Sequence, residues 1–293
     1  YRRQRQMCIR DRQTVADAVT IGVMSQPEDI CLLRHDGSGK NAFKNPLSFR
    51  YLDDNFIESD AVKIGKTFMD YLKKTKDPRI HVYCSLKDGN TEFDKQFGLP
   101  NGYDSHTIAD APSGSFVGLE NTSNFNINTI LRLDAPTIFL MPSETKLLLA
   151  EAVLRNWTNG NAEVLYKEAI TSSMKEQEIA YGTQGKITDE EIETYLAQNL
   201  LSTANNTEKL QIIGEQYWVA TFINGYESYA NWRRTGYPKL IPTNYSGSMS
   251  PGVIPTRLPY PTDEYSINRA NVDTANQQQG ADKVTTHIWW DID

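Results

Sequence analysis

Cysteines are scarce in this sequence, and long apolar runs are absent. Its 293 residues include three cysteines, Cys8, Cys31 and Cys84, which lie far apart and form no CxxC pair. An odd, sparse set of this kind supports neither a disulfide framework nor a zinc site, so we expect free cysteines. No stretch of about 18 apolar residues occurs, and therefore no transmembrane helix is expected.

An excess of positive charge is also absent. Lys and Arg together number 30, Asp and Glu number 37, and the formal net charge is -7. This balance argues against a surface that neutralises phosphates. Nucleic acid is therefore not expected as a partner.

Motifs that carry catalysis or hold a cofactor are missing as well. No HExxH, GxSxG or Rossmann glycine pattern is present. In GSGK, at 37–40, Arg34 and Asn41 stand where a phosphate-binding loop needs Gly and Ser or Thr. We therefore expect no catalytic residue, no metal and no cofactor. The four histidines show no metal-ligand spacing: His35, His81, His106 and His287.

The first twelve residues, YRRQRQMCIRDR, carry the positive charge of a signal peptide, but no apolar segment follows them. They are similar to translated sequencing-adapter sequence. We therefore expect residues 1–12 to be non-native and residues 13–293 to form a single domain.

Helical periodicity predicts a mainly α protein. After a helix at roughly 59–74, the sequence predicts an antiparallel pair at 143–157 and 162–181, with Ser143 as the N-cap of its first member. Small residues stand where the helices of a tetratricopeptide unit approach each other. One such unit is clear from the spacing.

A further helix is expected after Thr188, which can form a capping box with Glu191. A long periodic segment follows, and Asn224-Gly225 is expected to divide it into two helices. Beyond Pro238 several prolines forbid a regular helix, so we expect loops and one short helix near 263–278.

The segment from Ser85 to Pro136 is rich in Gly, Asn, Ser and Pro. A loop segment of that length within a compact protein is usually functional or disordered. We therefore expect this segment to carry the working surface of the protein.

The most aromatic stretch is NGYESYANWRRTGYPKL, at 224–240. Its arginines could bind a planar anion through their guanidinium forks. The spacing favours a structural role, because the aromatic residues recur every third position, as on a packed helix face, and a neighbouring arginine commonly pairs with a buried glutamate. The aromatics expected to pack inwards are Tyr226, Tyr229 and Trp232. The predicted structural set is Glu151, Glu215, Glu227, Trp232, Arg233 and Arg234.

Several segments together resemble the SusD/RagB-like outer-membrane lipoproteins of Bacteroidetes, in the branch called SusD-like 2. The similarity runs in order from about Ile57 to Asp291. It is carried by LMPSETKLLLAEAVLRNWTNGNAEVLYKEAITSSMKE, GEQYWVATFINGYESYANWRRTGYP, KDPRI, and TRLPYPTDEYSIN with the later TTHIWWD. The combination is specific, whereas each segment alone is weak.

The resemblance implies a tetratricopeptide-like helical scaffold with long ligand-binding loops and little β structure. It implies a binding protein without catalysis, which takes glycans, oligosaccharides or peptides at the cell surface and delivers them to a TonB-dependent, SusC-like transporter in the outer membrane. The lipoprotein signal and acylated cysteine of the family are not found in this sequence. We therefore expect the chain to be a truncated fragment, the C-terminal larger part of a SusD-like domain, whose lipid anchor and surface location are inferred from the family.

Sugar recognition needs flat apolar surfaces and a few polar groups that orient hydroxyls. The loop residues that meet this requirement are Tyr103, Phe116, Asn121, Asn124 and Tyr245. Aromatic residues on predicted helices are expected in the core instead: Trp157, Tyr166, Trp218 and Trp232.

Two alternatives stay open. A helical-repeat scaffold that binds only peptide or protein partners would share the same periodicity. A glycoside hydrolase needs two carboxylates at a defined distance, and a single sequence does not reveal that distance. The identity of the ligand is not predicted, because it depends on loop conformations.

Overall fold

The computed structural model describes residues 2–53, 62–103, 107–201, 205–244 and 248–288, with side chains from residue 11 onward. Its backbone contacts divide the chain into two compact units. The first comprises Tyr1–Pro100 and Pro112–Pro238, and the second comprises Asn101–Ala111 and Lys239–Asp293.

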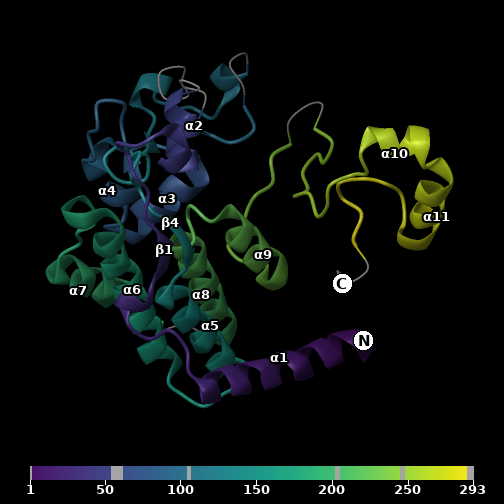
Figure 1. Ribbon diagram of the computed structural model, residues 1–293, viewed down its shortest axis with the longest axis horizontal. Helices are drawn as coiled ribbons and strands as arrows, with labels where there is room; N and C mark the ends of the chain where they lie inside the picture. The colour runs from purple at the N-terminus through teal and green to yellow at the C-terminus, as the bar shows by residue number, and fades with distance from the viewer. Residues whose placement is uncertain (1, 54–61, 104–106, 202–204, 245–247, 289–293) are drawn as a thin grey trace. The chain divides into compact units, whose positions relative to one another are not determined.

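Helices dominate the first unit, and its strands are short (Figure 1). This is the mainly α fold predicted from the sequence. The helices are α1 Arg2–Ile21, α2 Pro46–Asp53, α3 Lys66–Thr75, α4 Ile80–Tyr83, α5 Pro142–Leu154, α6 Ala162–Tyr181, α7 Asp189–Gln198, α8 Asn206–Ala220 and α9 Gly225–Thr235. The strands are β1 Cys31–Leu33, β2 Cys84–Ser85, β3 Asn124–Phe125 and β4 Thr137–Leu140.

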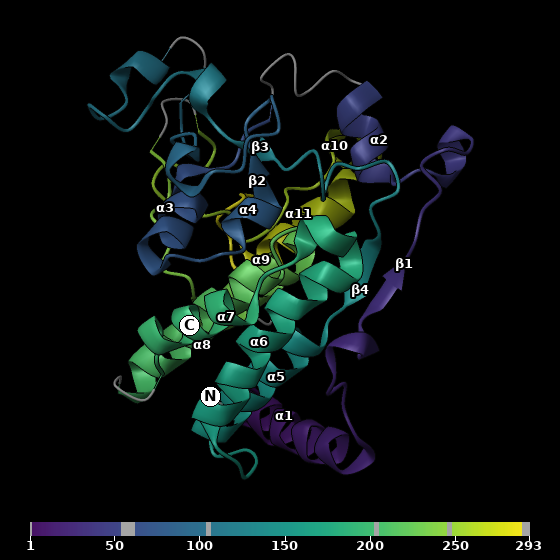
Figure 2. The same cartoon turned by 90° about the vertical axis from the view of Figure 1, so that its left-hand side faces the viewer.

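The helices α5 and α6 lie side by side and form the tetratricopeptide-like pair expected from the sequence (Figure 2). Ala150 and Ala169 are completely buried, and their small side chains let the helices approach closely. The N-cap prediction was wrong, because α5 begins at Pro142, which suits a first helical position. Ser143 instead donates its hydroxyl to Glu176 Oε2 at 2.6 Å.

The helices α7 and α9 begin where the sequence predicts. The capping box of Thr188 and Glu191 opens α7, and an equivalent box at Asn205 opens α8. The predicted division of the last long helix is confirmed at Asn224, whose side chain caps α9. Gly236 ends α9 in the left-handed region that glycine tolerates, with φ of 72°.

Aromatic packing joins α3 to the end of α8 in the core of the first unit. The ring of Phe68 stacks on that of Phe222 with centroids 4.3 Å apart, and it meets Trp218 edge to face at 4.9 Å. Tyr166, predicted as a core residue, is 1% exposed. Trp218 is half-buried and packs against the margin of the core. Trp157 was predicted on a helix in the core, but α5 ends at Leu154, so Trp157 lies after the helix and outside the core cluster.

The strands form two small antiparallel pairs, β1 with β4 and β2 with β3. The pair β2–β3 ties the beginning of the segment 85–136 to its middle. The rest of this segment, within its described residues 85–103 and 107–136, consists of loops and single turns of 3₁₀ helix, namely η3 Phe93–Lys95, η4 Ile108–Asp110 and η5 Leu119–Asn121. The two cysteines whose side chains are described, Cys31 and Cys84, are free, as expected.

The segment 85–136 is fastened to the residues that precede α3. The backbone N–H of Leu99 donates to the carbonyl of Ile64, and the carbonyl of Leu99 accepts a hydrogen bond from the backbone N–H of Lys66. Both bonds are 2.7 Å long. The predicted helix at 59–74 is shorter in the structure, because these extended contacts occupy the residues just before Lys66. Residues 59–61 lie outside the described part of the chain.

In the described part of the second unit, two α-helices stand in place of the single short helix predicted near 263–278. They are α10, Thr262–Ile267, and α11, Arg269–Gln279, separated at Asn268. Asp282 organises the unit, because it pairs with Arg257 at 2.8 Å and accepts the hydroxyl of Tyr265 at 2.6 Å. The Arg257–Asp282 pair is almost completely buried.

Candidate functional site

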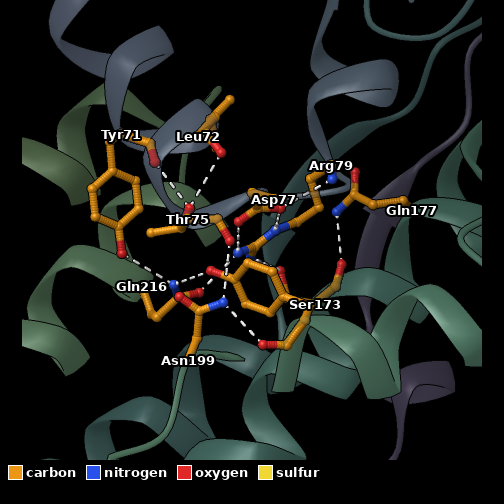
Figure 3. Close-up of polar contacts among 10 residues, drawn as sticks. Tyr71, Leu72, Thr75, Asp77, Arg79, Ser173, Gln177, Asn199 and Gln216 are labelled. Atoms are coloured by element: carbon orange, nitrogen blue, oxygen red, sulfur yellow. Dashed lines mark hydrogen bonds and ion pairs between the residues drawn. The ribbon is translucent and has the colours of Figure 1, made fainter. Parts of the chain in front are cut away.

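A buried arginine lies where the KDPRI segment leaves α3 (Figure 3). Arg79 is 0% exposed, and its Nε donates to Asp77 Oδ1 at 2.9 Å. The same guanidinium donates to Ser173 Oγ on α6 at 3.0 Å and to Gln216 Oε1 on α8 at 2.8 Å. One side chain therefore ties the turn after α3 to two helices of the scaffold.

Gln216 extends this network towards α7 and α3. Its Nε2 donates to Tyr71 Oη at 3.1 Å (Figure 3). The same Nε2 donates to Tyr195 Oη at 2.7 Å. The amide of Asn199 adds a bond to the carbonyl of Thr75 at 3.2 Å. The ends of α3 and α7 are thus held together by polar contacts.

The electrostatics of the network indicate a structural role for Arg79. Burial alone lowers the pKa of a guanidinium, but the adjacent Asp77 carboxylate outweighs this effect and holds the pKa of Arg79 above its usual range. Its donors are directed to protein acceptors, and no part of the residue reaches solvent. Arg79 therefore positions its surroundings and does not meet a ligand.

A pocket of about 520 Å³ lies directly outside this network, between α3 and α7. We call it the α3–α7 pocket. It falls within the range of about 300–1,000 Å³ that is usual for small-molecule sites. Its lining residues are Lys73, Lys76, Pro78, Phe93, Glu190, Glu191, Thr194, Tyr195 and Gln198.

The apolar surface of the pocket comes from Phe93, Pro78 and the buried ring of Tyr195. The guanidinium of Arg79 lies 5.9 Å from the centroid of the Tyr195 ring, so this ring separates the pocket from the buried network. Phe93 belongs to η3 and thus to the predicted working segment. The combination of ring surfaces with nearby polar groups suits a ligand that has one apolar face and several hydroxyls.

Two of the charged residues that line the pocket are held by protein partners. The ammonium of Lys73 lies 4.2 Å from the centroid of the Phe97 ring, and burial lowers the pKa of Lys73 although Asp94 and Asp70 oppose the shift. Glu191 caps α7; burial raises its pKa, but hydrogen bonds from Thr188 outweigh this and the net shift is downward. Both side chains are therefore fixed in place.

The structure spreads the predicted ligand-binding residues over both units. Tyr103 is half-exposed in the second unit, whereas Phe116 is half-exposed in the first. Asn121 is exposed, but its amide donates to the carbonyl of Val117 at 2.9 Å and to Glu120 Oε1 at 3.0 Å. None of these three lines the α3–α7 pocket.

Asn124 does not have the exposed loop position that the prediction gave it. It lies in β3 opposite Ser85 and is 1% exposed, because the β2–β3 pair is covered by the core. Its burial rules out a direct contact with a ligand at the surface of this structure. Tyr245 lies outside the described residues.

The ion pair expected between the WRRTG segment and a buried glutamate joins Arg234 to Glu151. Arg155 Nε also bonds to Glu151 Oε1, at 2.7 Å. Burial raises the pKa of Glu151, but the two arginines outweigh it, and the pKa lies below its usual value. Glu215 has another partner, Gln211, and Glu227 accepts the hydroxyl of Tyr217 at 3.3 Å.

The aromatic residues of α9 do not pack inwards as expected. Tyr226 is 92% exposed and Tyr229 is 41% exposed, whereas Trp232 is half-buried and stacks on Tyr229 with ring centroids 6.0 Å apart. The prediction was wrong because the face of α9 that meets the scaffold is polar. It carries the buried Asn231 and the Arg234 that pairs with Glu151.

Several residues of the pocket were missed from the sequence. Lys73 falls at the end of the helix predicted at roughly 59–74, and Phe93 lies in the segment TEFDKQF, for which the sequence predicts no particular role. An aromatic pair in this segment, Phe93 and Phe97, was the available signal. The pocket residues on α7 gave no signal in the sequence, because the polar stripe of this helix has the pattern of an ordinary solvated helix face.

The described part of the chain contains no group of three or more His, Cys, Asp or Glu side chains that could hold a metal ion. Among its helices, none combines the length and the hydrophobicity needed to cross a lipid bilayer.

Comparison with known proteins identifies one family. A family model named SusD-like 2 and described as starch-binding associating with outer membrane matches residues 7–261. A search of curated proteins gives no match.

Solved structures with the same fold include a chitin-binding protein that is 28% identical, with a TM-score of 0.76 over 96% of this chain and 59% of that one. A Bacteroidetes SusD-like protein is 22% identical, with a TM-score of 0.77 over 96% of this chain and 65% of that one. A SusD homolog from Bacteroides thetaiotaomicron is 24% identical, with a TM-score of 0.73, 97% of this chain and 61% of that one. The chain therefore spans less than two-thirds of the length of these structures.

Proposed function

Because the chain belongs to the SusD-like 2 family, whose members associate with the outer membrane, we propose that it binds nutrient glycans at the cell surface and delivers them to a TonB-dependent transporter. The protein acts by binding alone and leaves the glycan intact. A lipid anchor tethers it to the membrane.

The observation that carries the proposal is the family match over residues 7–261. The description of that family refers to starch binding, and two solved relatives are named as chitin-binding, one of them from Flavobacterium johnsoniae. Both polymers are uncharged glycans. A soluble oligosaccharide of either type is therefore the first ligand to test.

The structure supports a binding role, because different residues of the first unit stabilise the scaffold and line the pocket. Buried pairs such as Arg234–Glu151 and Arg79–Asp77 hold the helical scaffold together. The α3–α7 pocket, by contrast, opens to solvent and combines ring surfaces with polar side chains. A rigid scaffold that carries such a pocket needs no chemical step to recognise a sugar.

Binding is tested by isothermal titration calorimetry with chitohexaose, maltohexaose and a mixed peptide pool as probes. We expect one of the oligosaccharides to bind and the peptides not to bind. Binding of peptides alone would favour the alternative, a helical-repeat scaffold for peptide or protein partners.

Delivery to a transporter needs a separate test. Outer membranes from a cell that expresses the full-length protein are solubilised, and the protein is captured through a tag. We expect a TonB-dependent, SusC-like transporter to co-purify, and repeated capture without one would contradict this partner. Release of reducing sugar from either oligosaccharide would contradict the absence of catalysis and favour a glycoside hydrolase.

A further inference from the structure

We infer that the α3–α7 pocket is a subsite for one uncharged sugar ring, formed by Phe93 of the loop segment together with the polar face of α7. This inference rests on the proposed glycan-binding function and assigns one contact of the glycan to a defined place. The argument depends on the apolar surface, the available polar groups, the charge balance and the rigidity of the pocket.

The apolar surface of the pocket suits the C–H face of a pyranose ring. Phe93 is half-buried, so its position is fixed by packing against the core while part of its ring stays accessible. The half-buried Pro78 extends the surface on which a ring can lie, and the buried Tyr195 forms the wall behind it. Aromatic side chains of this kind supply contact area with little loss of conformational entropy.

Polar groups around this surface are available to a ligand. The side chains of Thr194, Gln198, Lys76 and Glu190 make no hydrogen bond or ion pair with other described residues. Gln198 offers both donors and acceptors, and Thr194 offers a hydroxyl. Because Thr194 and Gln198 lie four residues apart on α7, they share a helix face and can meet neighbouring hydroxyls of one ring.

The charges that line the pocket balance. Lys73 and Lys76 contribute two positive charges, and Glu190 and Glu191 contribute two negative charges. An acidic or basic ligand therefore gains no net attraction, and it meets a like charge on one side of the pocket. Hydroxyl groups can bond to both kinds of side chain, so this arrangement favours an uncharged sugar.

The wall behind the pocket is rigid before any ligand arrives. Tyr195 is held through Gln216 by Arg79, and the contact of Asn199 with Thr75 joins the ends of α7 and α3. A preformed wall lowers the entropy lost on binding. The buried network thus gives the pocket its shape without touching the ligand.

The test compares chitohexaose and maltohexaose binding to the wild type, Phe93→Ala and Gln198→Ala by calorimetry. Phe93→Ala removes ring surface and should weaken binding about tenfold. Gln198→Ala changes an exposed side chain, so it keeps the fold, and it should weaken binding about fivefold. Phe139→Ala is the matched control, because Phe139 is 53% exposed on β4 and does not line this pocket; its affinity should equal that of the wild type.

The charge assignment is tested with a fully de-N-acetylated chitohexaose and an oligogalacturonate, which should bind more weakly than the uncharged probes. If either charged probe binds more tightly than the uncharged probes, the assignment of an uncharged sugar to this pocket is wrong. Unchanged affinity of an uncharged probe for both pocket variants would overturn the subsite and leave the proposed function standing. If neither uncharged probe binds the wild type, the proposed function fails and the subsite fails with it.

Discussion

Arg234 and Glu151 form a two-pronged ion pair between α9 and α5. Nη1 lies 2.6 Å from Oε1, and Nη2 lies 2.7 Å from Oε2. Glu151 is nearly buried, whereas Arg234 keeps part of its side chain in solvent. The pair therefore docks the last scaffold helix of the first unit and leaves the carboxylate dependent on its arginines.

Replacing Arg234 with alanine should lower stability and leave ligand affinity unchanged. We expect the free energy of unfolding to fall by about 1–3 kcal/mol, because Glu151 loses one of its two charged partners while remaining buried. Urea denaturation measures this change, and calorimetry with an oligosaccharide measures affinity. Arg233→Ala is the matched control, because the neighbouring guanidinium lies over the Tyr229 ring. Normal melting with lost binding would show that Arg234 belongs to the ligand site.

Replacing Arg79 with lysine should lower the stability of the fold strongly, although it keeps the positive charge. An ammonium cannot contact Asp77, Ser173 and Gln216 in the fork geometry that a guanidinium provides. We expect a loss of about 3–5 kcal/mol, which is the usual effect of breaking a buried pair. Thermal unfolding checks the loss, and Lys66→Arg, at an exposed i,i+4 pair, is the control that should change little. Equal stability of Arg79→Lys and the wild type would contradict the role of the network.

The scaffold could be predicted from the sequence because its signals are local. The capping box at Thr188 and the break at Asn224 are each defined by neighbouring residues, and long helices with a regular apolar period tolerate errors of a residue or two at their ends. The error at Ser143 is of this kind. Burial of Ala150 against α6 follows from the same period.

The candidate site could not be predicted in the same way. Its residues lie on segments around positions 73–78, 93 and 190–198, and only the fold brings them together. The positions of Tyr226 and Asn124 were mistaken for related reasons. For Tyr226, a three-residue period indicates that the helix has an aromatic face, but it does not indicate whether other elements cover that face. For Asn124, a short strand such as β3 cannot be distinguished from a loop by composition alone.

Replacing Gly98 with alanine should loosen the segment that carries Phe93. A Cβ at this position would lie 2.7 Å from the backbone nitrogen of Lys66 and 2.8 Å from Met69 Cβ, so the loop must move away from α3. We expect a loss of about 2–3 kcal/mol in stability. Thermal unfolding checks it, and Gly225→Ala is the control, since nothing lies within 4 Å of the Cβ added there. An unchanged melting temperature for Gly98→Ala would contradict the close packing.

A carboxyl group at the start of α5 should make stability depend on pH near neutrality. Glu144 is 6% exposed, and burial, with the nearby charges of Glu227 and Glu176, raises its pKa to about 7 from 4.5. A group whose pKa is higher in the folded state stabilises the fold fully below its unfolded pKa, and this contribution is lost as the pH rises through the folded value. The wild type should therefore lose up to roughly 3 kcal/mol between pH 4.5 and 8 from this group.

The variant Glu144→Gln isolates this contribution, because it keeps the shape of the side chain and removes its titration. Urea denaturation from pH 5 to 8 should give a difference between wild type and variant that grows in favour of the variant as the pH rises. Other titrating groups, including the histidines, are common to both proteins and cancel in the difference. Glu227→Gln should move the midpoint of the wild-type dependence to lower pH, because it removes a negative charge that faces Glu144 through Tyr217. Parallel pH profiles for the wild type and Glu144→Gln would rule out a protonated Glu144 in the folded protein.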